Sequence, residues 1–282
     1  MTETIDIEYL RGWIGSRDTI ADLVSEDLAR KYHATFDLPG NAPAHGEIVP
    51  RLIHFCLGQP AVPTAGLGDD GHPKRGGFLP PVPLQRRMWA GGSLVFHGDL
   101  RVGDTVERVS SIDDVVLKEG RTGTLCFVTV SHRIEVAGTL MVEERQDLVY
   151  RGMDAAGAAA KTLPPADPGE HRQEMKAETP LLFRYSALTF NGHRIHYDRS
   201  YATGVEGYPG LVVHGPMQAA MLLNYATKLR GEPPARFGFR GLSPLFEGET
   251  FTLNASSRGD RLNLWTAKQN GPVCMSAEAV WA

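Results

Sequence analysis

The chain has few cysteines, no long hydrophobic run and no excess of positive charge. Its three cysteines lie far apart, without a CxxC pair or a metal-binding spacing, at Cys56, Cys126 and Cys274. That pattern argues against a disulfide scaffold and favours a reducing, cytoplasmic compartment. No apolar segment approaches the ~18 residues of a membrane span, and the first residues lack the basic and apolar regions of a signal peptide. Because the net charge is −4 and the pI about 6.2, we expect no nucleic-acid or membrane partner.

The 282 residues otherwise have the composition of a protein that buries a core, with 42% hydrophobic and 22% charged residues. This length corresponds to one large domain or two domains of usual size. The 31 glycines and 19 prolines favour β structure joined by turns over a helical bundle.

The first half predicts helices followed by a meander. Helical spacing between residues 5 and 38 predicts one or two short helices, and apolar residues on one face of 48–56 predict another that ends at Gly58. Residues 58–92 form a Pro/Gly-rich loop without a period. From Gly91 the period becomes two, which predicts an antiparallel meander. Its strands are expected at 93–96, 100–106, 111–118, 124–130 and 139–143.

The second half predicts a linker, one long helix and more strands. Residues 152–180 are rich in alanine, proline and charge and predict a linker. Strand-like segments resume at Leu181, and an apolar helix is predicted over 216–229, ended by Gly231. The last strands are expected at 237–242, 249–255, 262–268 and 273–281.

The two halves repeat each other weakly. Ala44-His45-Gly46 opens the helix expected in the first half, and Val213-His214-Gly215 opens the helix of the second. A pattern of one helix packed against an antiparallel sheet, repeated in both halves of the chain, predicts a duplicated α+β unit. We expect an N-terminal unit at 1–151, the linker at 152–180 and a C-terminal unit at 181–282.

The most informative stretch is a short polar loop followed by a helix start. The loop reads Asn191-Gly192-His193-Arg194-Ile195-His196, and the helix begins at His214-Gly215-Pro216. An imidazole moves protons near neutral pH. A helix start offers unpaired N–H groups to a developing oxyanion. This pairing favours chemistry on a carbonyl compound.

These residues resemble the MaoC-like acyl-thioester hydratases and dehydratases, whose signature is a D-x-N-P-x-H-x-D loop followed by H-G at the start of the hotdog helix. The segments FRYSALTFNGHRIHYD and EGYPGLVVHGP are similar to hydroxyacyl-thioester dehydratase type 2 and to hydratases of C5 dicarboxylyl-CoA esters. The segment RRMWAGGSLVFHGDLRVGD resembles their companion FAS1-like dehydratase unit. The resemblance covers nearly the whole chain. It implies an α+β double hotdog, two tandem units that each wrap an antiparallel sheet around a central helix, with no cofactor and no metal.

The resemblance also assigns catalytic roles. The catalytic histidine of the family falls on His196, and the helix-start glycine falls on Gly215, whose N–H would hold the thioester oxygen. The catalytic aspartate falls on Asn191, which takes no proton but can orient a water through its amide. His196 would then perform both proton steps. The N-terminal unit keeps His45-Gly46 but lacks such a loop, so we expect it to be non-catalytic.

The implied reaction is the reversible addition of water to an enoyl-CoA thioester. The preferred substrate is a C5 dicarboxylyl-CoA, mesaconyl-C4-CoA or itaconyl-CoA, which would give citramalyl-CoA. Its free carboxylate requires a cation, and Arg184 and Arg194 flank the loop. His193 is a further candidate contact to the substrate. The basic residues of the long loop are candidates for binding the CoA phosphates, namely Lys74, Arg75, Arg86 and Arg87. A homodimer is compatible with the sequence.

Four alternatives remain open. The substrate could be a fatty-acyl 3-hydroxyacyl thioester, or the enzyme could be a hotdog thioesterase, since one fold hosts both reactions. Loss of the catalytic aspartate also allows a non-catalytic acyl-CoA-binding protein. His196, Asp198 and His214 could form a 2-His-1-carboxylate iron site. We favour Asp198 as a helix N-cap and His214 as a packing residue.

Overall fold

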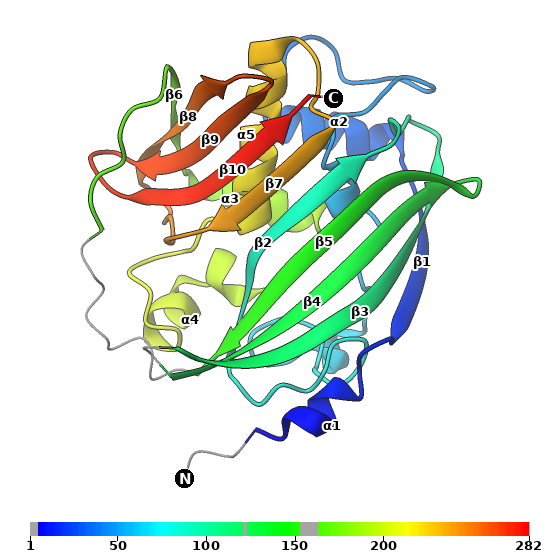
Figure 1. The fold of residues 1–282 in the computed structure, drawn as a ribbon, viewed down its shortest axis with the longest axis vertical. Helices are drawn as coiled ribbons and strands as arrows, with labels where there is room; N and C mark the ends of the chain where they lie inside the picture. Colours follow the sequence, from blue (N-terminus) through cyan, green and yellow to red (C-terminus); the bar gives the residue numbers. More distant parts are fainter. Residues whose placement is uncertain (1–4, 121–122, 153–162, 282) are drawn as a thin grey trace.

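A single ten-stranded antiparallel sheet runs through both halves of the chain (Figure 1). The structure is a computed structural model, and it describes residues 5–120, 123–152 and 163–281. The strand order is β1-β3-β4-β5-β2-β7-β10-β9-β8-β6. The two halves meet where β2 (Arg86–Phe96) pairs with β7 (Arg236–Gly241). Backbone hydrogen bonds therefore join the halves in the centre of the sheet.

The other elements follow in chain order. The first half adds α1 (Ile7–Arg11), β1 (Arg17–Leu23), α2 (Glu26–Thr35), β3 (Thr105–Gly120), β4 (Gly123–Val136) and β5 (Thr139–Arg151). The second half adds β6 (His171–Lys176), α3 (Thr179–Leu188), α4 (Arg199–Gly204), α5 (Gly215–Arg230), β8 (Thr250–Arg258), β9 (Arg261–Lys268) and β10 (Val273–Val280). Short 3-10 helices of the described residues are η1 (Ile53–Cys56), η2 (Thr64–Gly66) and η4 (Arg194–His196).

The central helix of the second half is α5, and it confirms the helix predicted over 216–229. Pro216 fits the first turn because that turn has no intrahelical acceptor for its N–H. Gly231 ends the helix in the left-handed conformation, with φ 80°. Nine of the sixteen residues of α5 are buried, so the helix is apolar around most of its circumference. It packs against β8, β9 and β10 and forms the core of this half.

The predicted meander of the first half is confirmed, with fewer and longer strands. β4 pairs with β3 on one side and β5 on the other, and buried residues alternate along it from Cys126 to Ile134. That alternation places one face of the sheet on the core. The strand expected at 111–118 is part of β3, whereas only Thr105 and Val106 of the strand expected at 100–106 belong to it. The four strands predicted after α5 are confirmed as β7 to β10.

The helix predicted over 48–56 is wrong. Pro50 lacks the N–H that a helix interior needs, and Leu52 has φ 68°, in the left-handed region. One 3-10 turn, η1, is all that forms there. The expectation that each half carries one long helix therefore fails in the first half. Leu52, Phe55 and Cys56 are buried on irregular backbone, whereas Ile48 is exposed.

Three other expectations change. Residues 17–23 form strand β1 rather than a helix. The chain is helical, not extended, after residue 180, because α3 begins with Pro180 in its first turn. Arg86 and Arg87 lie in β2 and not in the long loop.

The division of the chain into units stays a prediction. Within the range predicted as a linker, residues 171–176 form β6, which pairs with β8. The remainder of that prediction includes residues 153–162, which lie outside the described residues. Among the helices of the described ranges, none combines the length and the apolar character needed to cross a bilayer.

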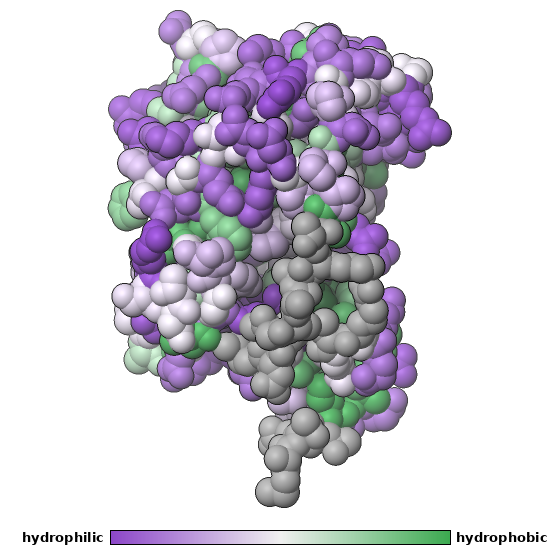
Figure 2. All heavy atoms as spheres, turned by 90° about the vertical axis from the view of Figure 1, so that its left-hand side faces the viewer, coloured by the Kyte–Doolittle hydropathy of each residue, from purple (hydrophilic) through white to green (hydrophobic). Residues whose placement is uncertain are grey.

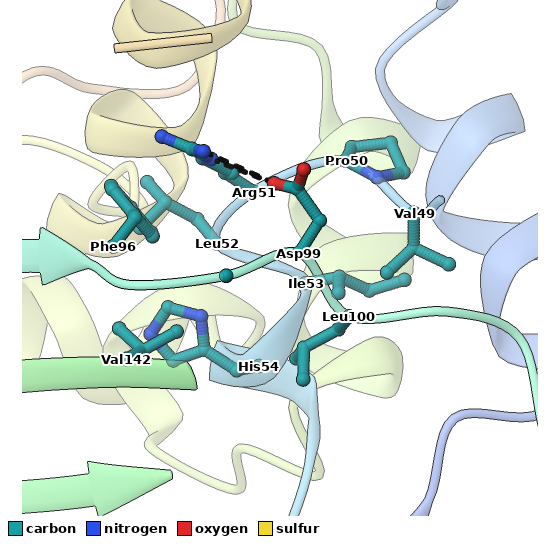
Figure 3. A pocket seen from close by; sticks show the side chains of 11 residues that line it. Val49, Pro50, Arg51, Leu52, Ile53, His54, Phe96, Asp99, Leu100 and Val142 are labelled. Atoms are coloured by element: carbon teal, nitrogen blue, oxygen red, sulfur yellow. Dashed lines mark hydrogen bonds and ion pairs between the residues drawn. The ribbon is translucent and has the colours of Figure 1, made fainter. Parts of the chain in front are cut away.

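The surface near β6 and β8 is polar. Figure 2 shows this side of the molecule, with hydrophilic side chains across its upper part and apolar ones lower down. The cavity in Figure 3 lies in the first half, where the ion pair between Arg51 and Asp99 spans 3.1 Å. Its volume is about 10 Å³, room for one water at most. This cavity is too small for an acyl thioester.

Candidate active site

The loop between α3 and α4 holds the predicted catalytic residues in a defined turn. Asn191 donates its backbone N–H to Ser186 O at 2.9 Å, and its side-chain Oδ1 accepts the backbone N–H of His193 at 3.0 Å. This is an Asx turn, which asparagine stabilises well. The Asn191 side chain therefore shapes the loop, and its Nδ2 is left as a donor.

His196 is buried and held through one ring nitrogen. Its Nδ1 lies 2.7 Å from Val212 O, which is only an acceptor. Nδ1 therefore carries the proton and Nε2 keeps a lone pair. Burial lowers the pKa of His196 to about 4. The imidazole is neutral at pH 7 and can accept a proton.

The ring of His196 lies flat on the ring of His214. Their centroids are 3.6 Å apart and their planes differ by 19°. His214 is fully buried, and its Nε2 lies 2.8 Å from Ser186 Oγ. Because His214 directly precedes Gly215, this stack places the imidazole of His196 beside the first turn of α5.

The start of α5 has the properties of an oxyanion site. The N–H groups of its first turn have no intrahelical acceptor, and Pro216 has none to offer. Gly215 and Met217 are therefore the first available donors, aided by the helix dipole. A Cβ placed on Gly215 would meet nothing closer than 3.9 Å, the side chain of Met275 and the carbonyl oxygen of Trp89. A Cβ at this position would therefore make only ordinary van der Waals contacts.

A loop from the first half lies against the catalytic loop. The backbone N–H of Arg194 donates to Asp70 O at 2.9 Å. Gly71 has φ 86°, and a Cβ on it would stand 1.9 Å from Gly192 O. Only glycine allows so close an approach of two backbones in this conformation. The two glycines thus fix how the loops meet.

This contact adds Asp70 and His72 to the site. His72 Nδ1 lies 3.0 Å from Asp70 Oδ2, and Asp70 Oδ1 accepts the backbone N–H of His72 at 3.0 Å. The ring of His72 lies against that of His193, with centroids 4.1 Å apart and planes tilted by 36°. The ring of His193 meets that of His196 edge-on at 5.4 Å. Four histidine rings therefore form one continuous row, from His72 to His214.

All four imidazoles favour the neutral form. Burial, and next the charge of Arg87, lower the pKa of His72 to about 4. Burial also lowers the pKa values of His193 and His214. The pKa of Asp70 is lowered as well: burial is the largest single effect and raises it, but the hydrogen bonds and charge of His72 together outweigh burial. At pH 7 the row is uncharged and is flanked by one carboxylate.

Two of the predicted substrate-binding arginines are held in ion pairs. Arg194 bonds Asp198 at 2.8 Å, while Asp198 also accepts the N–H of Tyr201 at 3.0 Å. The predicted N-cap role of Asp198 is thereby confirmed. Its oxygens are occupied, which disfavours the iron site. Arg86 is buried in an ion pair with Glu206 at 3.1 Å.

The remaining basic residues are placed differently from one another. Arg184 is exposed on α3. Arg75 donates to the carbonyl of Gln85 at 2.6 Å and also to those of Val82 and Leu84, so it braces its own loop. Arg87 lies opposite Tyr150 in the sheet. Its charge helps to lower the pKa of His72 and partly offsets the rise that burial causes in the pKa of Tyr150. No carboxylate of the described residues pairs with Arg87.

A family model, hydroxyacyl-thioester dehydratase type 2, matches residues 52–247. The chain belongs to this family of MaoC-like hotdog enzymes. It is 42% identical to a mesaconyl-C4-CoA hydratase of Chloroflexus aurantiacus over 267 residues, 94% of this chain and 95% of that one. The family identifies the protein as a hydratase or dehydratase that acts on acyl thioesters.

Solved structures show the fold. A MaoC-like dehydratase from Phytophthora capsici superposes with a TM-score of 0.71 at 15% identity, over 99% of this chain and 98% of that one. A Mycobacterium tuberculosis protein described as a double hotdog superposes with a TM-score of 0.55 at 13% identity, over 95% and 96%. The predicted α+β double hotdog is confirmed.

The structure brings His196, His193, Asn191 and the start of α5 together, as the sequence predicted. It places Arg184 on the surface of α3, and it pairs Arg86 with Glu206 and Arg194 with Asp198. Sequence reasoning missed Asp70 and His72. Their only local signal was an Asp-Gly-His triplet in a long ordered loop. The catalytic and binding roles themselves remain predictions.

Proposed function

We propose that the protein adds water reversibly to the double bond of an enoyl-CoA thioester, with a C5 dicarboxylyl-CoA as its substrate. The observation that carries this proposal is the position of His196, whose ring stacks on His214 at the start of α5 and whose Nδ1 proton is bonded to Val212 O, which leaves Nε2 unprotonated. Identity of 42% to a mesaconyl-C4-CoA hydratase supports the substrate class.

In this reaction His196 transfers the proton and Gly215 stabilises the negative charge on the thioester oxygen. His196 Nε2 takes a proton from the attacking water, whose oxygen bonds to Cβ. The electron pair of the double bond moves toward the thioester oxygen, which the N–H of Gly215 stabilises. The protonated His196 then returns its proton to Cα. Water adds across the double bond, and the enzyme regains its starting state.

Arg87 is the cation best placed to select a dicarboxylate. In a mesaconyl ester linked through C4, the free carboxylate sits on Cβ, the carbon that takes the hydroxyl. Its partner must therefore lie beside the histidine row, where Arg87 acts on His72. A guanidinium without a protein carboxylate partner can bind this group in two hydrogen bonds.

The test is a substrate panel with Arg87→Met. Wild type should hydrate mesaconyl-C4-CoA faster than crotonyl-CoA or a medium-chain enoyl-CoA. The variant should lose about tenfold or more on the dicarboxylyl ester, the scale of one charge-assisted contact, and retain crotonyl-CoA hydration. Arg184→Met, at an exposed arginine on α3, is the matched control and should behave as wild type. Release of free thiol without hydration would instead support a thioesterase.

A fatty-acyl 3-hydroxyacyl thioester is the second candidate substrate, because the family model is named for that chemistry. Preference for straight-chain esters in the same panel would favour it. We also propose a cytoplasmic location, which the three free and buried cysteines support. A homodimer remains a prediction that chromatography with light scattering would test.

A further inference from the structure

The site lacks the carboxylate that shares the water with the histidine in MaoC-like enzymes. Asn191 stands at that position, and its Oδ1 already accepts the backbone N–H of His193. An amide takes up no proton, and the one oxygen of this amide serves the turn. The turn therefore already uses the amide oxygen of Asn191, and a neighbouring residue is a further candidate acceptor for the second hydrogen of the attacking water.

The loop of the first half supplies such an acceptor. His72 donates from Nδ1 to Asp70, so its Nε2, on the opposite edge of the ring, keeps a lone pair. The His72 and Asp70 side chains are only 18% and 21% exposed. The ring of His193 touches both His72 and His196. Two neutral imidazoles thus flank His193. In each, the Nδ1 proton is in a hydrogen bond and the Nε2 lone pair remains available as an acceptor.

Three side chains at this site are close enough together to bind a metal cation. Single ligand atoms of Asp70, His72 and His193 lie within 4.8 Å of one another. However, the Asp70 carboxylate already bonds the Nδ1 proton of His72, and the positive charge of Arg87 acts on the same ring. A divalent cation would be repelled by that charge. The arrangement favours a hydrogen-bonded dyad.

We propose that His72, oriented by Asp70, takes over the water-holding role of the missing carboxylate, so that the active site is completed by the first half of the chain. This rests on the proposed function. The water donates one O–H to His196 Nε2 and the other to His72 Nε2. His196 removes the first proton and delivers it to Cα. The second hydrogen stays on the new hydroxyl group, still bonded to His72, and no net proton is gained or lost.

The experiment separates water addition from the chemistry at Cα. Hydration of mesaconyl-C4-CoA and of crotonyl-CoA is measured by mass spectrometry. In parallel, a saturated C5 dicarboxylyl-CoA is incubated in D₂O, and deuterium uptake at Cα is followed. Exchange needs His196 and Gly215 but no attacking water. The variants are His72→Phe, which keeps a ring without an acceptor, and His72→Gln and Asp70→Asn, which keep hydrogen-bonding groups.

His72→Phe should lower kcat for hydration about 10²-fold, the scale of a lost hydrogen bond at the reacting atoms, and leave deuterium exchange within about threefold. His72→Gln should recover part of the hydration rate, and Asp70→Asn should be intermediate. Asp69→Asn changes the neighbouring exposed carboxylate and should match wild type.

Three results would overturn the inference. The first is hydration by His72→Phe at the wild-type rate. The second is an equal loss of hydration and of deuterium exchange in both the His72→Gln and Asp70→Asn variants. The third is a stoichiometric divalent cation that is bound to wild type and absent from His72→Phe. A wild type that hydrates no ester would instead refute the proposed function. The two failures are therefore distinguishable.

Discussion

The imidazole of His196 lies flat against that of His214, with ring centroids 3.6 Å apart. His214 is the N-cap of α5, so the proposed base, His196, packs directly against the start of the helix that carries the proposed oxyanion donors. Packing alone therefore fixes the distance between the proton acceptor and the N–H of Gly215. Such preorganisation lets these groups act without reorganising during the reaction.

Gly215→Ala should separate activity from stability. The added Cβ makes only ordinary contacts, the nearest at 3.9 Å, and Gly215 is the first residue of α5. We expect the free energy of unfolding to change by no more than about 0.5 kcal/mol. Activity should fall at least about tenfold because the methyl group crowds the oxyanion site. Gly204→Ala, where a Cβ meets nothing within 4 Å, is the control. Equal activity of both variants would refute the oxyanion role.

Gly71→Ala should uncouple the two loops of the site. Its Cβ would stand 1.9 Å from Gly192 O, so the loop that carries Asp70 must move away. Gly76→Ala has a similar backbone strain, φ 90° against 86°, but its Cβ lies 3.7 Å from the nearest atom. Both variants should lose about 1–2 kcal/mol from the left-handed conformation. Only Gly71→Ala should also lose most of its hydration rate, measured at a temperature where both variants are folded.

The pH dependence of kcat/KM should show an acidic limb well below the usual histidine range. Hydration needs the neutral forms of His196 and His72, whose pKa values burial lowers to about 4 from 6.5. The rate should be constant from pH 8 to about 5 and fall as pH drops through about 4. Because the charge of Arg87 lowers the pKa of His72, Arg87→Met should shift the acidic limb to higher pH. A limb near 6.5 in wild type would show that the base is exposed to solvent.

Local pattern was sufficient for the elements with a clean period. The alternation in β4, the buried length of α5 and the glycine that ends it are all encoded within a few residues of each other. Asp198 was also identified as a cap because capping is a local hydrogen bond. The helix start at Gly215 and the loop of His196 were identified because each is a short, contiguous sequence motif.

The errors arose where tertiary contacts override local preference. The apolar spacing of 48–56 suggested a helix, but Pro50 and the left-handed Leu52 prevent one. Residues 181–188 lack a clear helical signal, yet they belong to α3, which begins at Thr179. His72 could not be assigned from sequence, because its role depends on a contact between Gly71 and Gly192 over more than a hundred residues of chain.

The most direct measurement is the fate of labelled water. The protein and its His196→Ala variant are incubated with mesaconyl-C4-CoA in H₂¹⁸O, and the acyl product is analysed by mass spectrometry, with His171→Ala, at an exposed position on β6, as the control. We expect ¹⁸O in the hydroxyl group on Cβ for wild type and the control, and a rate about 10²- to 10⁴-fold lower for His196→Ala. Label that appears only in a released carboxylate, or equal rates for wild type and His196→Ala, would contradict hydration at this site.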